Sequence, residues 1–225
     1  IENIPQDVLS SLVKSEIFVS AEEDELSEIL NFNILKNKNE DTKVLAYTIQ
    51  PSGNCQLGCH YCGQNHTNKT MSQEVLDLSY ERILKKCDDL GSALQEMRIT
   101  WYGGEPLTGL SSLMQLSKKL IDLAESRNLR YTSKIVTNAL NLKYSLFEKL
   151  VNQCEITSYQ ITIDGMKEFH DKRRYLKNGN ASFYIIINNI KEIVKSDLYK
   201  EKAHFNIRCN VDKENKDNVF DFIDY

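Results

Sequence analysis

The sequence predicts a parallel α/β fold, arranged as an incomplete barrel of five strand–helix units. From residue 43 onward, short runs rich in β-branched and aromatic residues alternate with stretches whose apolar residues recur at helical spacing. This alternation is typical of parallel sheets with helical crossovers. The chain stops within 219–225, an amphipathic pattern without a helix stop signal, so we expect more protein to follow. In such folds the chemistry lies on loops at the carboxyl ends of the strands.

The five strands and their helices can be placed in order along the chain. The strand runs are rich in valine, isoleucine, threonine and tyrosine, which suit a pleated, half-buried surface. They are expected over 44–50, 97–101, 133–137, 159–163 and 204–211. Apolar stripes at helical spacing begin between them, at Val75, Leu113, Leu142 and Phe183.

The first 43 residues are expected to form a short acidic, helical extension. Residues 1–44 carry ten acidic residues against four lysines. Apolar residues recur at helical spacing from Val8 and again from Leu26. The polar stretch 36–42 predicts a linker, so the chain divides into an extension over 1–43 and a core over 44–225.

The composition excludes several classes of protein. Apolar residues make up 41% of the 225, and the mean hydropathy is −0.44. No apolar run approaches the roughly 20 residues of a membrane-spanning helix. The net charge of −4 gives no reason to expect nucleic acid or a membrane as partner. No signal peptide is recognisable and six cysteines are too few for a disulfide scaffold, so we expect a reducing, cytoplasmic location.

Three cysteines, Cys55, Cys59 and Cys62, are crowded into eight residues directly after the first strand. Thiolates at this density repel one another and oxidise unless a metal binds them. One interpretation is a structural zinc site completed by His60 or His66. The other is an iron–sulfur cluster, in which three thiolates on a four-iron cubane leave one iron open to a substrate or cofactor.

The second motif is the run Trp-Tyr-Gly-Gly-Glu-Pro at 101–106, at the end of the second strand. Adjacent glycines followed by proline make a tight strand-to-helix turn on their own. They also expose backbone groups to a ligand, and the glutamate adds an anion suited to an ammonium group. Because both motifs follow neighbouring parallel strands, we expect them to face one cavity.

Together the two motifs resemble those of the radical S-adenosylmethionine (SAM) enzymes. The shared features are the cysteine spacing, with an aromatic residue before the last cysteine, and the Gly-Gly-Glu-Pro turn that follows. The resemblance extends to the branch with a carboxyl-terminal iron–sulfur domain, called SPASM, which includes anaerobic sulfatase-maturing enzymes and maturases of ribosomally made peptides. Its further motifs are VTNA at 136–139, ITIDG at 161–165, HDKRR at 170–174, NGNASF at 178–183 and RCNV at 208–211.

The resemblance implies a partial (β/α)6 barrel, similar to a TIM barrel, in which Cys55, Cys59 and Cys62 hold a 4Fe-4S cluster. The fourth iron would chelate the amino and carboxylate groups of SAM. An electron from the cluster would cleave SAM to methionine and a 5'-deoxyadenosyl radical, which would abstract hydrogen from the substrate. The resemblance also implies a SPASM-type domain with auxiliary clusters beyond residue 225, and a reducing partner such as flavodoxin or ferredoxin.

The same resemblance assigns the residues of the second motif to SAM. Gly103, Gly104 and Glu105 are expected at the methionine amino group, and Pro106 is expected to shape their turn. Tyr61, between the second and third cysteines, is expected near the adenine.

Further residues at strand ends complete the implied site. Asn138 and Thr162 are expected at the ribose, and Arg174 at the methionine carboxylate, which suits a bidentate guanidinium. Asp164 is expected to contact the cofactor or the substrate. Ala139 stands where the branch usually has glycine, so the turn after the third strand is expected to differ.

The leading hypothesis is a radical SAM enzyme that modifies a side chain of a peptide or protein. Two alternatives remain open: a zinc-stabilised binding module without catalysis, and a radical SAM enzyme that acts on a small molecule. Residues 170–173 have an alternative interpretation of their own, as a solvent-exposed helical face.

Overall fold

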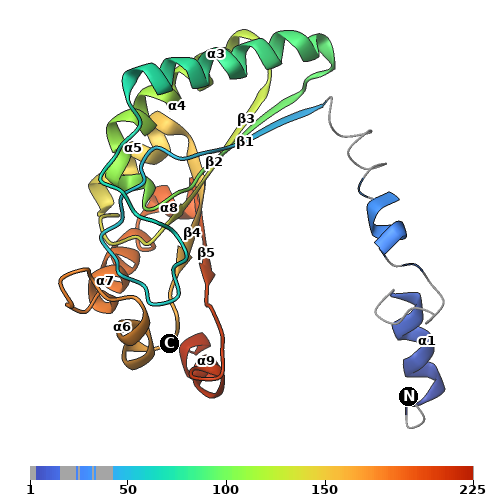
Figure 1. Cartoon of the computed structure of the whole chain (residues 1–225), viewed down its shortest axis with the longest axis vertical. Helices are drawn as coiled ribbons and strands as arrows, with labels where there is room; N and C mark the ends of the chain where they lie inside the picture. The colour runs from blue at the N-terminus through green and yellow to red at the C-terminus, as the bar shows by residue number, and fades with distance from the viewer. Residues whose placement is uncertain (1–3, 16–23, 25, 32, 34–42, 225) are drawn as a thin grey trace. The chain divides into compact units, whose positions relative to one another are not determined.

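The computed structural model describes residues 4–15, 24, 26–31, 33 and 43–224 (Figure 1). The chain divides into two compact units, Ile1–Thr42 and Lys43–Tyr225. In the first unit, α1 spans Gln6–Lys14 and residues 26–31 are helical, as the apolar spacing predicts. No residue of α1 is buried. The linker expected over 36–42 lies outside the described residues.

The second unit is built on a five-stranded sheet with the strand order β1-β2-β3-β4-β5. All four neighbouring pairs are parallel. The strands are β1 Val44–Ile49, β2 Glu96–Trp101, β3 Arg130–Thr137, β4 Ile156–Thr162 and β5 His204–Arg208. Because each crossover returns to the adjacent position, the sheet has the topology of a barrel that is open along one seam. The predicted fold class is confirmed.

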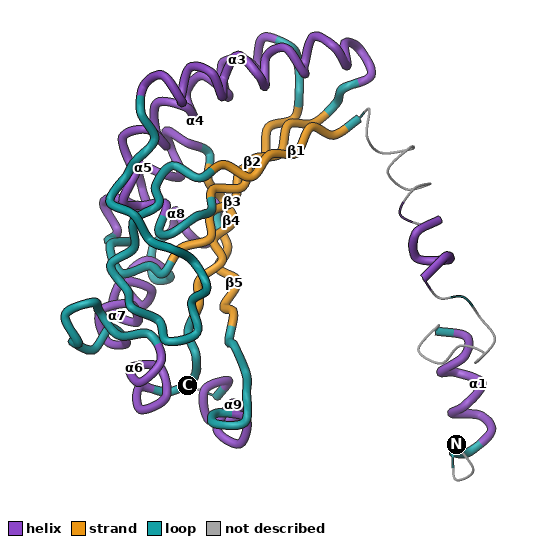
Figure 2. Tube along the Cα trace, viewed as in Figure 1, coloured by secondary structure: helices purple, strands orange, loops and turns teal. Residues whose placement is uncertain are grey.

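Helices fill the crossovers and lie on one side of the sheet (Figures 1 and 2). The helices are α3 Gln73–Leu90, α4 Leu110–Ser126, α5 Tyr144–Cys154, α6 Lys167–Arg173, α7 Phe183–Ile193, α8 Asp197–Lys202 and α9 Val219–Ile223. Short 3-10 helices span Gly91–Ala93, Pro106–Gly109 and Lys216–Asn218. Local signals set several of these boundaries: the hydroxyl of Ser72, for example, accepts a hydrogen bond from the Val75 amide and caps α3.

The hydrophobic core fills the space between the sheet and these helices. Alternate residues of the strands point into it, including Met97, Ile99, Trp101, Ile135, Tyr159 and Ile161, which are all fully buried. The helices contribute Leu76, Ile83, Leu113, Leu116, Leu120, Phe147, Leu150, Phe183 and Ile186. Burial of each such side chain stabilises the fold by about 2 kcal/mol. The core therefore holds the strand ends in fixed positions.

The strands differ from the prediction mainly at their ends. β3 begins at Arg130 and β4 at Ile156, each three residues earlier than expected, because their first residues pair with a neighbouring strand. β5 ends at Arg208, not at 211. There the backbone N–H of Asn210 donates to the side chain of Asp164 (3.0 Å) and not to a strand, so the ladder stops.

Among the described residues of the second unit, 43–224, no helix lies on the opposite face of the sheet (Figure 1). Its side chains alternate with the core residues and are polar at most positions. Among the described residues, every helix is too short or too polar to span a bilayer.

Candidate active site

The three cysteines lie on a long loop between β1 and α3, residues 50–72, here called the cysteine loop (Figure 2). One edge of this loop is bonded to residues 102–106, here called the glycine turn: Gly104 N donates to Ser52 O (3.3 Å) and Glu105 N donates to Asn54 O (2.6 Å). The cysteine loop therefore has a fixed position above the end of β2.

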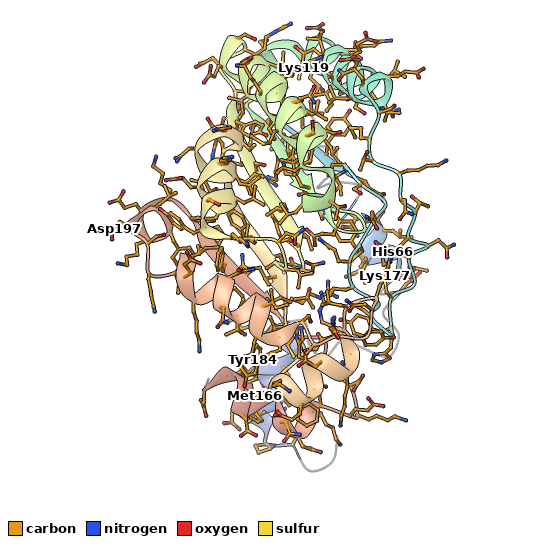
Figure 3. All side chains as sticks on the ribbon, turned by 90° about the vertical axis from the view of Figure 1, so that its left-hand side faces the viewer. His66, Lys119, Met166, Lys177, Tyr184 and Asp197 are labelled. Atoms are coloured by element: carbon orange, nitrogen blue, oxygen red, sulfur yellow. The ribbon has the colours of Figure 1, made fainter. Side chains whose placement is uncertain are left out.

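The other edge of the cysteine loop is bonded to the segment after α6. Gly58 N donates to Tyr175 O, and Lys177 N donates to Gln56 O, both at 2.9 Å. Figure 3 shows His66 and Lys177 close together on this side. Two independent anchors thus hold the loop, one from the β2 end and one from the segment between β4 and α7.

The glycines of the turn are required by close approach of the cysteine loop. A Cβ atom on Gly104 would lie 2.5 Å from the carbonyl oxygen of Asn54 and 2.9 Å from that of Gly53. Gly103 has φ of 142°, a conformation that L side chains rarely adopt. Only glycines at these two positions allow the loop backbone to pack against the turn.

Cys55, Cys59 and Cys62 line one cavity of about 290 Å³. Cys55 is buried, Cys59 is half-buried and Cys62 is exposed. Burial raises the pKa of Cys55, and burial raises the pKa of Cys59 to about 11 although Arg174 opposes the shift. Within the part of the chain that the structure describes, no three histidine, cysteine, aspartate or glutamate side chains gather closely enough to hold a single metal ion.

Glu105 lies at the base of the cavity with 1% of its surface exposed. Its carboxylate accepts hydrogen bonds from Thr137 Oγ1 (2.7 Å), Asn138 N (2.7 Å) and Leu107 N (3.1 Å). Burial raises the pKa of Glu105, and these hydrogen bonds oppose that shift. Glu105 therefore joins the glycine turn to the end of β3. Its contact with a methionine amino group stays a prediction.

Tyr61 belongs to a polar cluster of four residues, here called the Tyr61 cluster. Its hydroxyl donates to Asp164 Oδ2 (2.6 Å) and accepts from Arg174 Nη1 (2.7 Å) and Asn210 Nδ2 (3.0 Å). Asn210 also donates to Asp164 Oδ1 through Nδ2 (3.1 Å). Burial raises the pKa of Tyr61 to about 12. The cluster ties the cysteine loop to α6 and to the ends of β4 and β5.

His170 supports the Tyr61 cluster from behind. Its Nδ1 accepts from the backbone N–H of Asp164 (3.3 Å), and its Nε2 lies 3.0 Å from Ser182 Oγ. Burial lowers the pKa of His170 to about 4, so the ring is neutral near pH 7. His170 and Arg173 are buried, so the interpretation of 170–173 as a solvent-exposed helical face is wrong at these two positions, although Lys172 is exposed.

The turn after β3 keeps a conformation suited to glycine. Ala139 is fully buried and has φ of 59°. The side chain of Asn138 lies with its Nδ2 3.6 Å from Cys55 Sγ. The alanine therefore adopts a left-handed backbone conformation, which costs most residues other than glycine and asparagine about 1 kcal/mol.

The structure brings most of the sequence-predicted residues to one cavity. Those that line it are Cys55, Cys59, Tyr61, Cys62, Gly103, Gly104, Glu105, Asn138, Thr162 and Arg174. Asp164 lies behind the wall, fully buried, and Pro106 is buried at the start of the 3-10 helix. Their individual roles toward a cofactor stay predictions.

Sequence reasoning left several lining residues out of the site. They are Gly63, Gln64, His66, Tyr102, Val136, Thr137, Arg208 and Asn210. The rule that chemistry follows strand ends would have found Thr137, Arg208 and Asn210, since each ends or follows a strand. The sequence suggested His66 only as a zinc ligand, and the folded loop brings its Nε2 to 3.7 Å from Cys62 Sγ.

Comparison with models of known protein families identifies the family of this chain. The model of the Radical SAM superfamily matches residues 49–225, which is most of the chain. The chain belongs to the radical SAM superfamily. The members of this superfamily use a 4Fe-4S cluster and SAM, so the resemblance of the two motifs is confirmed. Membership favours the iron–sulfur interpretation of the cysteines over a zinc-stabilised module.

Individual radical SAM relatives are maturases. The chain is 32% identical over 180 residues to the cysteine-type anaerobic sulfatase-maturating enzyme of Clostridium novyi (strain NT), with 76% of this chain and 45% of the relative covered. It is 27% identical over 180 residues to the sporulation killing factor maturation protein of Bacillus subtilis (strain 168), with 80% and 39% covered. The chain therefore spans less than half the length of these curated relatives.

A solved structure shares the fold of this radical SAM core. Native anSMEcpe with bound AdoMet and Cp18Cys peptide superposes with a TM-score of 0.63 at 25% identity, covering 81% of this chain and 48% of that chain. That protein therefore holds SAM and a peptide together on a fold like this one.

The residues present fit the cofactors of the superfamily. Three thiols, the ligands that iron–sulfur clusters require, line one cavity. In the same cavity Arg174 is 8% exposed, and its buried Nε has no hydrogen-bond partner among the described residues. An unsatisfied buried guanidinium N–H is suited to an anionic group such as the carboxylate of SAM.

Proposed function

We propose that this protein is a radical SAM maturase that modifies a side chain of a peptide or protein. The observation that carries the proposal is the convergence of three thiols, the glycine turn and a buried guanidinium on one cavity, in a chain whose relatives are maturases. A 4Fe-4S cluster with SAM supplies reductive cleavage of SAM and hydrogen abstraction from a bound substrate.

The residues of this chain would divide the work as follows. Cys55, Cys59 and Cys62 would hold three irons of the cluster, after each thiol has lost its proton to solvent. Arg174, fixed through its Nη1 by the hydroxyl of Tyr61, would orient the carboxylate of SAM. The glycine turn would present backbone carbonyls to the amino group.

The strand ends would complete the site. Asn138 and Thr162 line the cavity at the ends of β3 and β4, where hydroxyl and amide groups suit a ribose. Asp164 has its carboxylate engaged by Tyr61 and Asn210, so we assign it the positioning of these two residues in place of a direct contact. The packed loop and helices would exclude water from the reacting atoms.

The decisive experiment is anaerobic reconstitution with iron and sulfide, reduction with dithionite, and measurement of 5'-deoxyadenosine. Wild-type protein should bind about four irons and four sulfides at Cys55, Cys59 and Cys62 and produce 5'-deoxyadenosine. The Cys59→Ala variant should bind about four irons fewer than wild type, with a matching fall in iron–sulfur absorbance, and reduce cleavage at least about a hundredfold. Retention of cleavage by this variant would refute the proposal.

A matched control removes a thiol outside the site. Cys87 is buried in α3 and does not line the cavity. Cys87→Ala should keep both the absorbance and the cleavage. Stoichiometric zinc in a colourless protein purified without air would instead favour a zinc-stabilised module, and 5'-deoxyadenosine whose yield responds only to small molecules would favour the small-molecule alternative.

We further propose that the partner that reduces the cluster is a small electron carrier such as flavodoxin or ferredoxin, and that the protein works in the cytoplasm. The proposal of auxiliary clusters in a SPASM-type domain rests on the maturase relatives, which are longer than this chain. Iron content of the full-length protein above four per chain would support it.

A further inference from the structure

The sheet face that no described helix of the second unit covers is unusual for a barrel because it is polar. Strand pairing places two rows of its side chains in register: Thr48, Thr100, Lys134, Ser158 and His204 form one row, and Val136, Gln160 and Asn206 form the next. Thr162 and Arg208 pair in a third row, nearest the cavity. Closed barrels usually fill this space with branched apolar residues. A face of hydroxyls, amides and cations is instead suited to a polar ligand.

The cations of this face differ in how their charge is balanced. Arg98, far from the cavity, forms an ion pair with Glu96 at 3.2 Å. Within residues 43–224, Lys134 donates only to the neutral Oε1 of Gln160 (2.9 Å). Arg208 lines the cavity beside Thr162. Within residues 43–224, no carboxylate lies within 4.0 Å of the charged nitrogens of Lys134 or Arg208.

These two cations are linked across the sheet through Gln160 on β4, and Arg208 lines the same cavity as the cysteines. The ammonium group of Lys134 donates to Gln160, which belongs to the row between the row of Lys134 and the row of Arg208. Gln160 pairs with Asn206, two residues before Arg208 on β5. One unbalanced positive charge thus lies at the middle of the sheet and the other at the cavity. An anionic group bound between them would gain favourable electrostatic energy from both.

We propose that Lys134 and Arg208 form a subsite that binds a carboxylate side chain of a peptide substrate, close in sequence to the residue that is modified. This inference rests on the proposed function and adds its substrate class, an acidic peptide segment. The surrounding hydroxyls and amides would pair with the peptide backbone. Lys134 is half-buried, so its pair with a carboxylate is screened less by salt than a surface pair.

The test uses the reconstituted full-length holoprotein with SAM and two fluorescein-labelled peptide probes. Both probes have the sequence Gly-Ser-Gly-Xaa-Cys-Xaa-Gly-Ser-Gly, where Xaa is Asp in one probe and Lys in the other. Fluorescence anisotropy at low salt should show at least about tenfold tighter binding of the acidic probe, and the difference should shrink as salt is raised. Equal binding of the two probes, or binding of neither, overturns the proposal.

Variants then locate the subsite. Lys134→Gln and Arg208→Gln should each weaken the acidic probe roughly fivefold, whereas Arg98→Gln, which alters a balanced charge on the same face, should leave it unchanged. Lys134→Glu should shift the preference toward the basic probe, an effect that damaged folding cannot produce. Unchanged preference in Lys134→Glu overturns the assignment.

Chemical acetylation of Lys134 tests whether the protein's own chain covers this face of the sheet. The acidic probe should protect Lys134 from acetic anhydride and leave Lys118 on α4, whose side chain is 76% exposed, as reactive as before. Resistance of Lys134 without any probe would show that the protein's own chain covers the face and would overturn the proposal. Loss of SAM cleavage with retained acidic preference would refute the proposed function alone, and the reverse result would refute only the subsite.

Discussion

The cysteine loop is held on its two sides by different kinds of contact. On the side of the glycine turn, backbone packs on backbone, and Gly104 leaves no room for a methyl group. On the side of α6 and the ends of β4 and β5, the side chains of the Tyr61 cluster add hydrogen bonds to the backbone bonds of Gly58 and Lys177. Backbone packing is sensitive to added volume, whereas a polar cluster is sensitive to the loss of single donors and to protons.

The largest effect is expected for Gly104→Ala. The new methyl group would overlap the carbonyl oxygens of Asn54 and Gly53, so the cysteine loop must move. We expect a loss of about 3 kcal/mol in the free energy of unfolding and loss of the reconstituted cluster. Denaturant unfolding and iron–sulfur absorbance measure the two effects.

The matched control for this change is Gly63→Ala in the same loop. No atom lies within 4 Å of a Cβ built at Gly63. Its unfolding free energy should stay within about 0.5 kcal/mol of wild type. Similar losses in both variants would contradict the close-approach explanation.

The next largest effect is the pH dependence of stability that comes from His170, which supports the Tyr61 cluster. The pKa of His170 is about 4 in the folded state, against an ordinary value of 6.5. Between these values the unfolded state binds the extra proton, so stability falls as pH falls, by about 2 kcal/mol at pH 5 relative to pH 7. Above pH 6.5 this contribution is complete and constant.

The measurement is the difference in unfolding free energy between wild type and His170→Gln as a function of pH, which cancels carboxylates common to both. The gap should narrow from pH 7 to pH 5. If the variant does not fold, an NMR titration of His170 in the wild type gives the same pKa directly. A pKa of His170 near 6.5 would be incompatible with its buried site.

The smallest effect is expected for Tyr61→Phe. The change removes the hydroxyl that joins Asp164, Arg174 and Asn210, and it should cost about 1 to 2 kcal/mol of unfolding free energy. Because Arg174 loses its partner, we also expect weaker binding of SAM, measurable by calorimetry. Tyr102→Phe is the control, since its hydroxyl only accepts a long 3.4 Å contact from Gln64. Equal effects of the two variants would remove the special role of the Tyr61 cluster.

The sequence predicted the fold and the centre of the site because both depend on local patterns. Alternating strand and helix patterns placed all five strands, and spacing alone singled out Cys55, Cys59 and Cys62. The glycine turn was predicted equally well, since two adjacent glycines followed by proline are typical of a tight strand-to-helix turn. The physical reason at Gly104, the approach of Asn54, appears only in three dimensions.

What the sequence did not predict depends on long-range pairing. Asp164 was expected at a cofactor or substrate, yet its carboxylate is engaged by Tyr61 and Asn210. The first three residues of β3 and of β4 were not predicted as strand, and they pair with a neighbouring strand. Ala139 was expected to alter a turn, but burial in the core holds it in a conformation suited to glycine. These features depend on contacts between residues that are far apart in the sequence, which a short sequence segment cannot show.

The partners of Tyr61 also impose an order of events during synthesis. Its hydroxyl bonds to residues 103, 113 and 149 positions later in the chain. While a ribosome is still making β4 and β5, the thiols already translated therefore lack one of the two anchors of their loop. The thiols therefore reach their final arrangement only after about residue 210 has emerged.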